Sequence, residues 1–477
     1  LHFVEEGLVS NGVSGEHFVR GLGGSRLDWR VNYGRASRDE PDLREVLYQR
    51  GIGSSGPFVL ADESQSGFRM FSELDDDSLD AAANWSVFST AGGRPTHVKF
   101  GVQYVDRTRD FRSRRFRYIP IVLNKDDSPG IDLTPTPEEL YIPAHIGEHF
   151  RFNEETRPVD AYDGEQTTAA GYAMVDHAIT AGSRLVAGVR VERFQQDVTT
   201  FDPFGLFERR ITASNRNTDI FPGVNYVHAL RPDMNLRAGY SITVNRPEFR
   251  ELAAFEFTDV VGSRAVRGNP ALERALIQNV DGRWELFTGR RGVLAASAFY
   301  KQFDRPIERV VIAGAQPIVT FQNADSARNV GFELEAARQI TDALHVNVNY
   351  TFVDSRITLA PAQRSVQTSL ERPLAGQSKH LINVIAEYAI GAFSGRLLYN
   401  AFGDRISDVG ANDAPDILEE GRHQLDVVLL QRFGRVNVRF TAENLTDSEY
   451  RFTQGAEDQR LFRIGRTFTL SFGFAAF

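Results

Sequence analysis

The chain has 477 residues, a formal net charge of −9 at pH 7 and no cysteine. The lack of cysteine excludes disulfide scaffolds, thiolate metal sites and cysteine nucleophiles, and the acidic balance argues against a nucleic-acid partner. No apolar run approaches the ~18 residues that a membrane helix needs, so any membrane role would have to use strands.

Segments in which apolar and polar residues alternate with a period of two run through most of the chain. The clearest lie at 27–34, 98–104, 236–244, 346–352 and 436–442. Alternate residues of a strand face opposite sides of a sheet, so each segment is expected to be a strand with one apolar and one polar face. A soluble β-sandwich has the same alternation, and this pattern alone therefore leaves the architecture open.

The connections between these strands indicate the architecture, because short and long ones alternate from residue 168 onward. The short ones lie near 181–184, 231–235, 288–292, 340–344, 390–394 and 433–435. The long ones lie near 198–217, 246–275, 304–328, 357–378, 405–420 and 445–461. Tight turns at one end of a meander and long loops at the other are typical of the transmembrane β-barrels of outer membranes.

The sequence therefore predicts an all-β fold, an antiparallel up-and-down transmembrane β-barrel whose strands pair only with their neighbours in sequence. We expect strands near 16–23, 26–37, 67–90 and 96–110, a frayed segment at 1–10, and roughly thirteen more strands from residue 168, about seventeen in all. The proline-containing stretch 111–166 is predicted to be one long extracellular loop.

The alternation also predicts which side chains face lipid, where a charged residue at the bilayer midplane costs about 2–4 kcal/mol. Expected to face outward are Leu236, Tyr240, Ile242, Val346, Val348, Phe440, Phe468, Leu470 and Phe472. Expected to point into the barrel are Arg237, Asn347, Asn349 and Arg439. Measured without a membrane, the outward residues should therefore be accessible to solvent.

Short motifs recur in a fixed order through residues 150–477. They are Arg157-Pro158 with Gly171-Tyr172, the block 239–252 (GYSITVNRPEFREL), Gly268-Asn269-Pro270, Phe299-Tyr300-Lys301, Gly331-Phe332-Glu333-Leu334-Glu335, Arg372-Pro373-Leu374-Ala375-Gly376 and Glu443-Asn444-Leu445. In this combination the chain resembles the TonB-dependent receptors, a family of outer-membrane transporters.

The resemblance implies a receptor in the cell outer membrane that imports a scarce solute with energy from the TonB complex. Its surroundings would be membrane lipid and lipopolysaccharide, and its ligand a small solute that the sequence does not identify. The family's N-terminal plug, through which TonB acts, and its first strands have no counterpart here. Because family members close about 22 strands, residues 1–477 are predicted to be the C-terminal part of one barrel domain, with about 17 strands and no ladder between the last strand and the first.

Two other functions are compatible with a barrel. One is a plugless outer-membrane porin or adhesin, and the other is a barrel enzyme such as a protease or lipase. No G-x-S-x-G or other nucleophile motif occurs, so we predict no enzyme activity, no catalytic residue and no cofactor.

Six arginines leave the predicted strand 96–110 and continue into the stretch 111–166. They are Arg107, Arg109, Arg112, Arg114, Arg115 and Arg117. Forked guanidinium donors suit an anionic ligand or lipopolysaccharide phosphates, although a solvated strand above the membrane would have the same pattern. We treat all six as candidates for ligand contact.

The segment His145-Ile146-Gly147-Glu148-His149 matches an inverted zinc-protease pattern, which requires a helix to hold both imidazoles on one face. Gly147 and the preceding Pro143 disfavour such a helix. We therefore predict no metal site, and keep His145 and His149 as ligand-contact candidates in an outer loop. The run Asp75-Asp76-Asp77 is interpreted as a solvated turn rather than a calcium site.

Overall fold

The computed structural model describes residues 2–22, 24–51, 53–63, 66–121, 130–257, 265–289, 292–312, 318–359, 364 and 366–474. Within these ranges, no helix has both the length and the apolar character needed to cross a membrane.

One large antiparallel sheet contains eighteen of the described strands. Seventeen of them follow one another in chain order: β1 (Glu5–Val19), β2 (Ser25–Glu45), β5 (Phe68–Ala91), β6 (Arg94–Pro120), β8 (Ala161–Thr180), β9 (Ser183–Phe201), β10 (Ile211–Arg231), β11 (Met234–Asn245), β14 (Ala275–Phe287), β15 (Val293–Asp304), β18 (Ser326–Gln339), β19 (Leu344–Thr358), β20 (His380–Ile390), β21 (Phe393–Phe402), β24 (Arg422–Phe433), β25 (Val436–Glu443) and β28 (Thr467–Phe474). Each pairs with the next. The remaining strand, β7 (Phe150–Glu154), lies along the end of β6. The predicted up-and-down order and strand count are confirmed.

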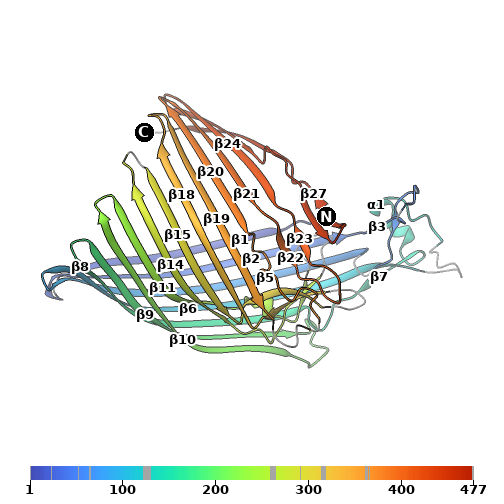
Figure 1. Ribbon diagram of the computed structural model, residues 1–477. Coiled ribbons are helices and arrows are strands. Elements are labelled where there is room, and N and C mark those ends of the chain that lie inside the picture. The colour runs from blue at the N-terminus through green and yellow to red at the C-terminus, as the bar shows by residue number, and fades with distance from the viewer. Residues whose placement is uncertain are drawn as a thin grey trace.

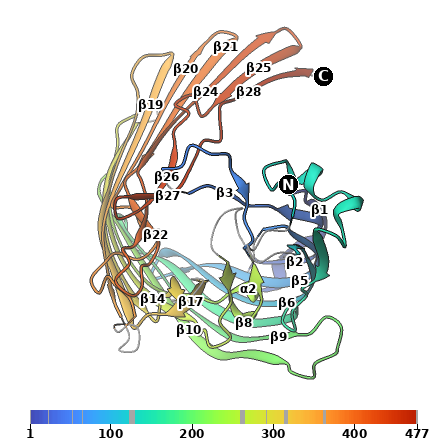
Figure 2. The ribbon, with the colours of Figure 1, turned by 90° about the vertical axis from the view of Figure 1, so that its right-hand side faces the viewer.

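The sheet is strongly curved. Figure 1 shows the strands side by side, and Figure 2 shows that they curl into an incomplete ring with β1 and β28 at its two ends. Among the described residues, β1 pairs only with β2 and β28 only with β25. The expected lack of a ladder between the last strand and the first is therefore found, while the plug and the additional strands stay predictions.

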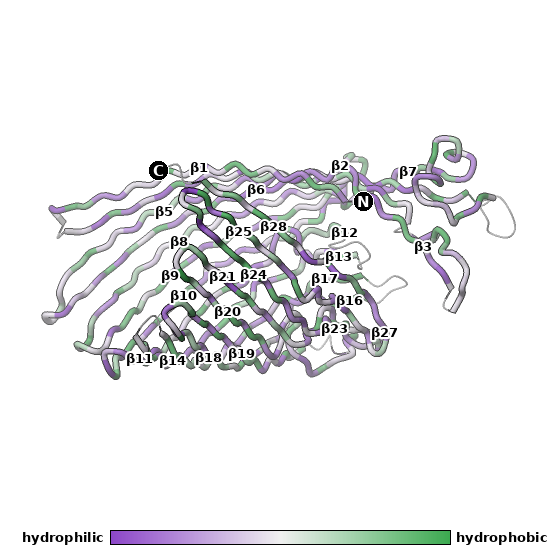
Figure 3. The backbone as a smooth tube through the Cα atoms, turned by 90° about the horizontal axis from the view of Figure 1, so that it is seen from above, coloured by the Kyte–Doolittle hydropathy of each residue, from purple (hydrophilic) through white to green (hydrophobic). Residues whose placement is uncertain are grey.

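The outward residues behave as expected for a lipid-facing surface. Leu236, Tyr240, Val348, Phe440, Phe468, Leu470 and Phe472 are exposed, and Ile242 and Val346 are half-buried. Figure 3 shows the alternation of hydrophobic and hydrophilic residues along the strands. On the opposite face, the Arg237 Nε donates a 2.6 Å hydrogen bond to Glu285, whose side chain is buried. The predicted apolar and polar faces are confirmed.

The strands differ greatly in length. β2, β5, β6, β8, β9 and β10, here called the tall wall, have 19 to 27 residues. The strands of the large sheet from β11 to β28, the low wall, have 8 to 15 residues. A tilted strand needs only about 9–11 residues to cross a bilayer, so the tall wall extends well beyond it on one side.

This extension corrects two expectations. The first strand is Glu5–Val19, not 16–23 with a separate segment at 1–10. The stretch 111–166 is not one loop, because 111–120 belong to β6 and 161–166 to β8. Between them lie the short helices α1 (Pro137–Leu140) and η2 (Pro143–His145), and β7. Above a membrane both faces of a strand meet water or other protein segments, so the alternation fades although the backbone ladder continues.

The long connections also form sheets of their own, which the sequence did not predict. β12 (Glu256–Phe257), β13 (Val266–Arg267), β17 (Ile318–Asn323) and β16 (Ile307–Ile312) form one, and β22 (Arg405–Asp408), β23 (Ile417–Glu419), β26 (Tyr450–Gln454) and β27 (Glu457–Phe462) form another. A third, small sheet pairs β3 (Tyr48–Gln49) with β4 (Val59–Leu60). β13 and β17 are parallel and come from different connections, so pairing is not confined to sequence neighbours.

The first of these sheets, with the short helix α2 (Phe249–Leu252), folds into the ring (Figure 2). The main buried apolar cluster joins Phe111 and Tyr162 of the tall wall to Phe249, Phe255 and Val319 of these connections. The core of the molecule is thus the contact between the inner wall and its own loops.

A buried ion pair holds a third connection against this sheet. Arg372 Nη1 and Nη2 lie 2.9 and 3.0 Å from the two carboxylate oxygens of Glu308 in β16. Both side chains are almost fully buried, and Arg372 also contacts the amide oxygen of Gln367. A bidentate pair of this kind fixes the orientation of both side chains as well as pairing their charges. It therefore gives Arg372 of the Arg372-Pro373 motif a structural role.

We predict that Val348→Arg destabilises the protein in its membrane by about 2–4 kcal/mol, because this outward side chain would place a charge in lipid. The adjacent Asn349→Arg, on the inner face, is the control and should change stability little. Urea titration of outer-membrane vesicles, read as loss of the heat-modifiable folded band, measures both. Equal effects of the two substitutions would contradict the assigned faces.

Candidate functional site

Two of the six candidate arginines meet on the inner face of the tall wall. Asp76 of β5 lies opposite Arg109 of β6 in the ladder. Its carboxylate accepts hydrogen bonds from Arg107 Nε at 2.9 and 3.0 Å and from Arg109 Nε at 2.6 Å. One buried carboxylate thus serves two guanidinium groups, and the local charge of the trio is positive.

A loop residue covers this trio. The Phe249 ring lies 5.3 Å from the Arg107 guanidinium carbon and 5.4 Å from that of Arg109. Phe249 begins α2, whose first turn is closed by Glu251 accepting a hydrogen bond from the Glu248 N–H at 2.9 Å. Burial raises the pKa of the Glu251 carboxyl. A cation held against an aromatic face is attracted by the ring's quadrupole, so α2 and the wall stabilise each other.

The residues before α2 tie it to the barrel. Arg246 pairs with Glu192 at 2.8 Å and with Asp219 at 3.2 Å, and its guanidinium lies 4.3 Å from the Phe194 ring centre. Asp219 also accepts a 2.8 Å hydrogen bond from Arg274 at the far end of the same connection. The two ends of this long connection therefore converge on one buried carboxylate of β10.

A cavity of about 560 Å³ lies on the inner side of the tall wall, next to this arrangement. Its lining includes three arginines, Arg38, Arg109 and Arg250, two glutamates, Glu40 and Glu45, and the aromatic residues Tyr162 and Phe257. Glu40 lies 2.5 Å from Arg38 Nη2 and accepts a 3.1 Å hydrogen bond from Ser72. The Arg250 guanidinium carbon lies 3.3 Å from the Phe257 ring centre. Guanidinium groups beside aromatic rings in a partly enclosed cavity suit a small anionic ligand with planar groups.

Two further candidate arginines hold loops in place. Arg115 Nε lies 2.8 Å from Asp160, both side chains being buried, and Arg115 also donates to the carbonyl oxygen of Glu256 in β12. Burial raises the pKa of the Asp160 carboxyl, and Arg115 opposes that shift. Arg117 donates to Asp62 at 2.8 Å. These arginines connect β6 to neighbouring segments and are not part of the cavity lining.

The remaining two candidates, Arg112 and Arg114, lie on the opposite face of β6, because they occupy even-numbered positions and the other four arginines odd-numbered ones. Arg112 lies 2.7 Å from Asp163, and Arg114 makes a bidentate pair with Glu154 of β7 at 3.0 and 2.9 Å. The structure thus divides the run among three surroundings and brings only Arg109 to the cavity.

His145 and His149 belong to the segment between α1 and β7, two elements that lie at one end of the molecule, away from the low wall (Figure 1). His145 Nδ1 is 2.9 Å from the Leu140 carbonyl oxygen, and the two imidazole rings are 5.5 Å apart. Only the single turn η2 precedes Ile146, so the predicted lack of a zinc-protease helix is confirmed. In the described ranges no three His, Cys, Asp or Glu side chains are grouped to hold a metal ion.

Asp76 is the residue that sequence reasoning missed. The run Asp75-Asp76-Asp77 is not a turn but the middle of β5. Asp75 and Asp77 face outward to Arg35 and Tyr33, and Asp76 faces inward to Arg107 and Arg109. Three consecutive aspartates resemble a turn, but alternate faces with arginines opposite stabilise them in a strand. The available signal was the run of six arginines in the next strand.

The sequence matches the family described as TonB dependent receptor-like, beta-barrel, over residues 12–445. The chain belongs to this family. It is accordingly an outer-membrane protein with a receptor-type β-barrel. No curated protein matches the sequence.

Solved structures of the family share the fold. The ferric-catecholate import receptor Fiu from E. coli superposes with a TM-score of 0.69 at 14% identity, and the match covers 99% of this chain and 64% of Fiu. The siderophore receptor PiuA from Acinetobacter baumannii gives 0.66 at 13% identity, covering 99% and 65%. The ferric yersiniabactin uptake receptor FyuA from Yersinia pestis gives 0.63 at 13% identity, covering 99% and 62%. The chain therefore spans less than two thirds of these structures.

We predict that Asp76→Asn destabilises the protein by about 1.5–3 kcal/mol, because two partly buried guanidinium groups lose their charged acceptor. Asp75→Asn is the matched control: its pair with Arg35 is exposed to solvent and should contribute clearly less to stability. Urea denaturation of both variants in outer-membrane vesicles measures the difference. A larger loss in Asp75→Asn would contradict the assignment of faces.

Proposed function

We propose that the protein imports a scarce anionic solute across the outer membrane with energy from TonB. The observation that carries the proposal is the cavity on the inner wall, lined by Arg109, Tyr162 and Arg250 next to the inward-folded α2. A solute entering from the long-loop end would meet this cavity before the middle of the barrel.

The lining favours a particular chemical class. Arg109 and Arg250 offer planar, permanently charged donors, and Phe257 and Tyr162 offer aromatic surface beside them. A metal chelate with negative charge and planar ligand groups has the complementary character. The names of three structural neighbours, receptors for a ferric catecholate, a siderophore and ferric yersiniabactin, support this class.

TonB is proposed as the energy source through a plug of the kind found in the family. A specific receptor binds its solute at low concentration, and directed release into the periplasm then requires an input of free energy. A porin or an adhesin of the same fold would need neither the plug nor the energy, and this difference gives the test.

Cells that produce the protein as their only receptor of this class are incubated with radiolabelled iron as a ferric catecholate or as ferric citrate. We expect saturable uptake of at least one chelate, abolished by deletion of TonB or by dissipation of the proton gradient. Binding to de-energised cells should persist. Uptake that is unaffected by either treatment and rises linearly with concentration would indicate a porin and overturn the proposal.

In the same cells, Arg109→Gln should weaken binding of the transported chelate roughly ten- to hundredfold, since a charge-assisted hydrogen bond of about 1.5–3 kcal/mol is lost. Arg112→Gln, on the other face of the same strand, is the control and should leave binding unchanged. Heat-modifiable migration verifies that both variants fold. Unchanged binding in Arg109→Gln would exclude this cavity as the solute site.

A further inference from the structure

The outer face of the low wall changes abruptly from apolar to cationic at its long-loop end. Tyr300 of β15 and Val330 of β18 lie opposite each other and are each 41% exposed. The next outward position on each strand is Gln302 and Arg328, which are again opposite each other. Two residues span only about 6.6 Å along a strand, so the edge of the apolar surface is sharp here.

The cationic row continues on the next strand. Arg328 lies directly opposite Arg356 of β19, and both side chains are exposed. Like charges at opposite positions of neighbouring strands destabilise a sheet. Asp354 lies 3.6 Å from Arg356 Nε, whereas none of the described acidic groups forms an ion pair with Arg328. The pair as it stands therefore has an excess of positive charge.

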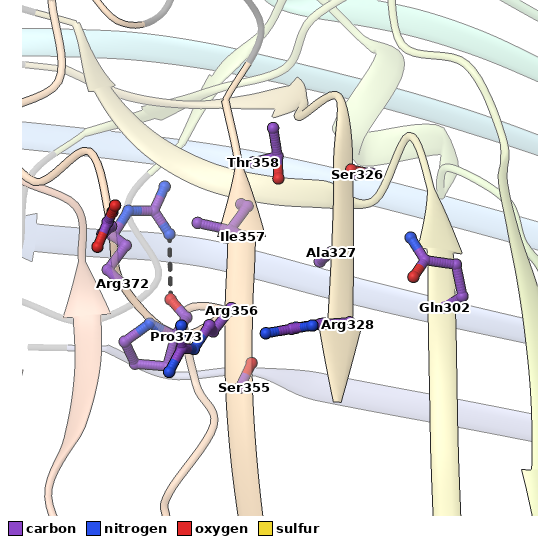
Figure 4. A pocket seen from close by; sticks show the side chains of 11 residues that line it. Gln302, Ser326, Ala327, Arg328, Ser355, Arg356, Ile357, Thr358, Arg372 and Pro373 are labelled. Carbon is purple, nitrogen blue, oxygen red and sulfur yellow. Dashed lines mark hydrogen bonds between the residues drawn. The ribbon is translucent and has the colours of Figure 1, made fainter. Parts of the chain in front are cut away.

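A cavity of about 580 Å³ adjoins this pair. Gln302, Ser326, Thr358 and Pro373 are among its lining residues, together with both arginines. Figure 4 shows Arg328 extending from β18 toward β19, where Arg356 and Pro373 lie, with Gln302 on the other side.

Two charged residues of the adjacent connection also line the cavity. The Arg372 guanidinium is bound to the buried Glu308 and contributes no free charge. Glu371 is the acidic residue of the lining, and Arg356 is paired with Asp354 just outside it. Arg328 is thus the guanidinium group of this cavity that pairs with none of the described acidic groups.

We propose that this cavity binds the phosphate ester of an anionic lipid headgroup, with the acyl chains of the lipid along Tyr300, Val330 and Phe332. The long connections lie on the extracellular side of outer-membrane barrels, so the site is at the headgroup level of the outer leaflet. A phosphate between Arg328 and Arg356 accepts from both forked donors and offsets their repulsion. The site is on the outer wall and is independent of the transported solute.

The test uses native mass spectrometry of the detergent-purified protein titrated with bisphosphorylated lipid A. We expect one preferentially bound copy, and an apparent Kd about tenfold or more weaker in the double variant Arg328→Gln with Arg356→Gln. Arg338→Gln is the matched control, an exposed outward arginine at the other end of β18, and should bind as the wild type does. A double variant with Lys at both positions keeps the charge but loses the fork, and should bind with intermediate affinity.

Two further probes separate the possible sources of phosphate. Dephosphorylated lipid A should bind no better to the wild type than to the glutamine double variant, and millimolar inorganic phosphate should compete only weakly with lipid A. The proposal is overturned if the double variant binds lipid A like the wild type, if dephosphorylated lipid A binds equally well, or if inorganic phosphate displaces lipid A completely. Because the glutamine variants also remove a repulsion, unchanged or increased thermal stability in detergent is expected, and their folding can be verified independently of lipid.

Discussion

Lipid offers the backbone no hydrogen-bond partner, and the rest of this structure depends on that constraint. Each unsatisfied amide or carbonyl in the hydrocarbon layer costs several kcal/mol, so the chain crosses only as strands that bond to neighbours on both sides. The ladder meets this demand for every strand between β1 and β28, the two strands at its ends having one partner each among the described residues. Its side chains need only be apolar outside and compatible with water inside. Sequence is therefore free to vary along the wall, which agrees with a shared fold at 13–14% identity.

On the inner wall, in a chain with a net charge of −9, single buried carboxylates are shared by pairs of arginines. Asp76 is shared by Arg107 and Arg109, and Asp219 by Arg246 and Arg274. In each case one carboxylate serves two guanidinium groups, and at Asp219 a second carboxylate, Glu192, also pairs with Arg246. Buried polar groups lower the stability of the fold unless their hydrogen bonds and charges are satisfied. α2 and the residues that flank it supply the remaining contacts of these arginines.

The transmembrane part of the fold was predictable from sequence because lipid imposes a strict alternation on each crossing strand. The predicted outward residues and the order of turns follow directly from that alternation. Outside the membrane the constraint ends, and there the prediction failed: β6 continues to Pro120 and β1 begins at Glu5. The pairing of Asp76 with Arg109 was not predictable, since it depends on the register between two strands. The parallel contact of β13 with β17 joins separate connections and leaves no local signal.

The unequal heights of the two walls have a consequence for the approach from outside the cell. The tall wall is a continuous hydrogen-bonded sheet, so the part of it above the membrane surface is rigid, unlike a set of separate loops. The low wall, on the other side of the incomplete ring, has shorter strands and therefore a lower rim (Figure 2). A bulky particle such as an antibody or a phage would meet the tall wall first. A small molecule diffusing along the membrane surface would reach the interior of the barrel more readily over the low wall. The extracellular opening therefore has a preferred direction of entry.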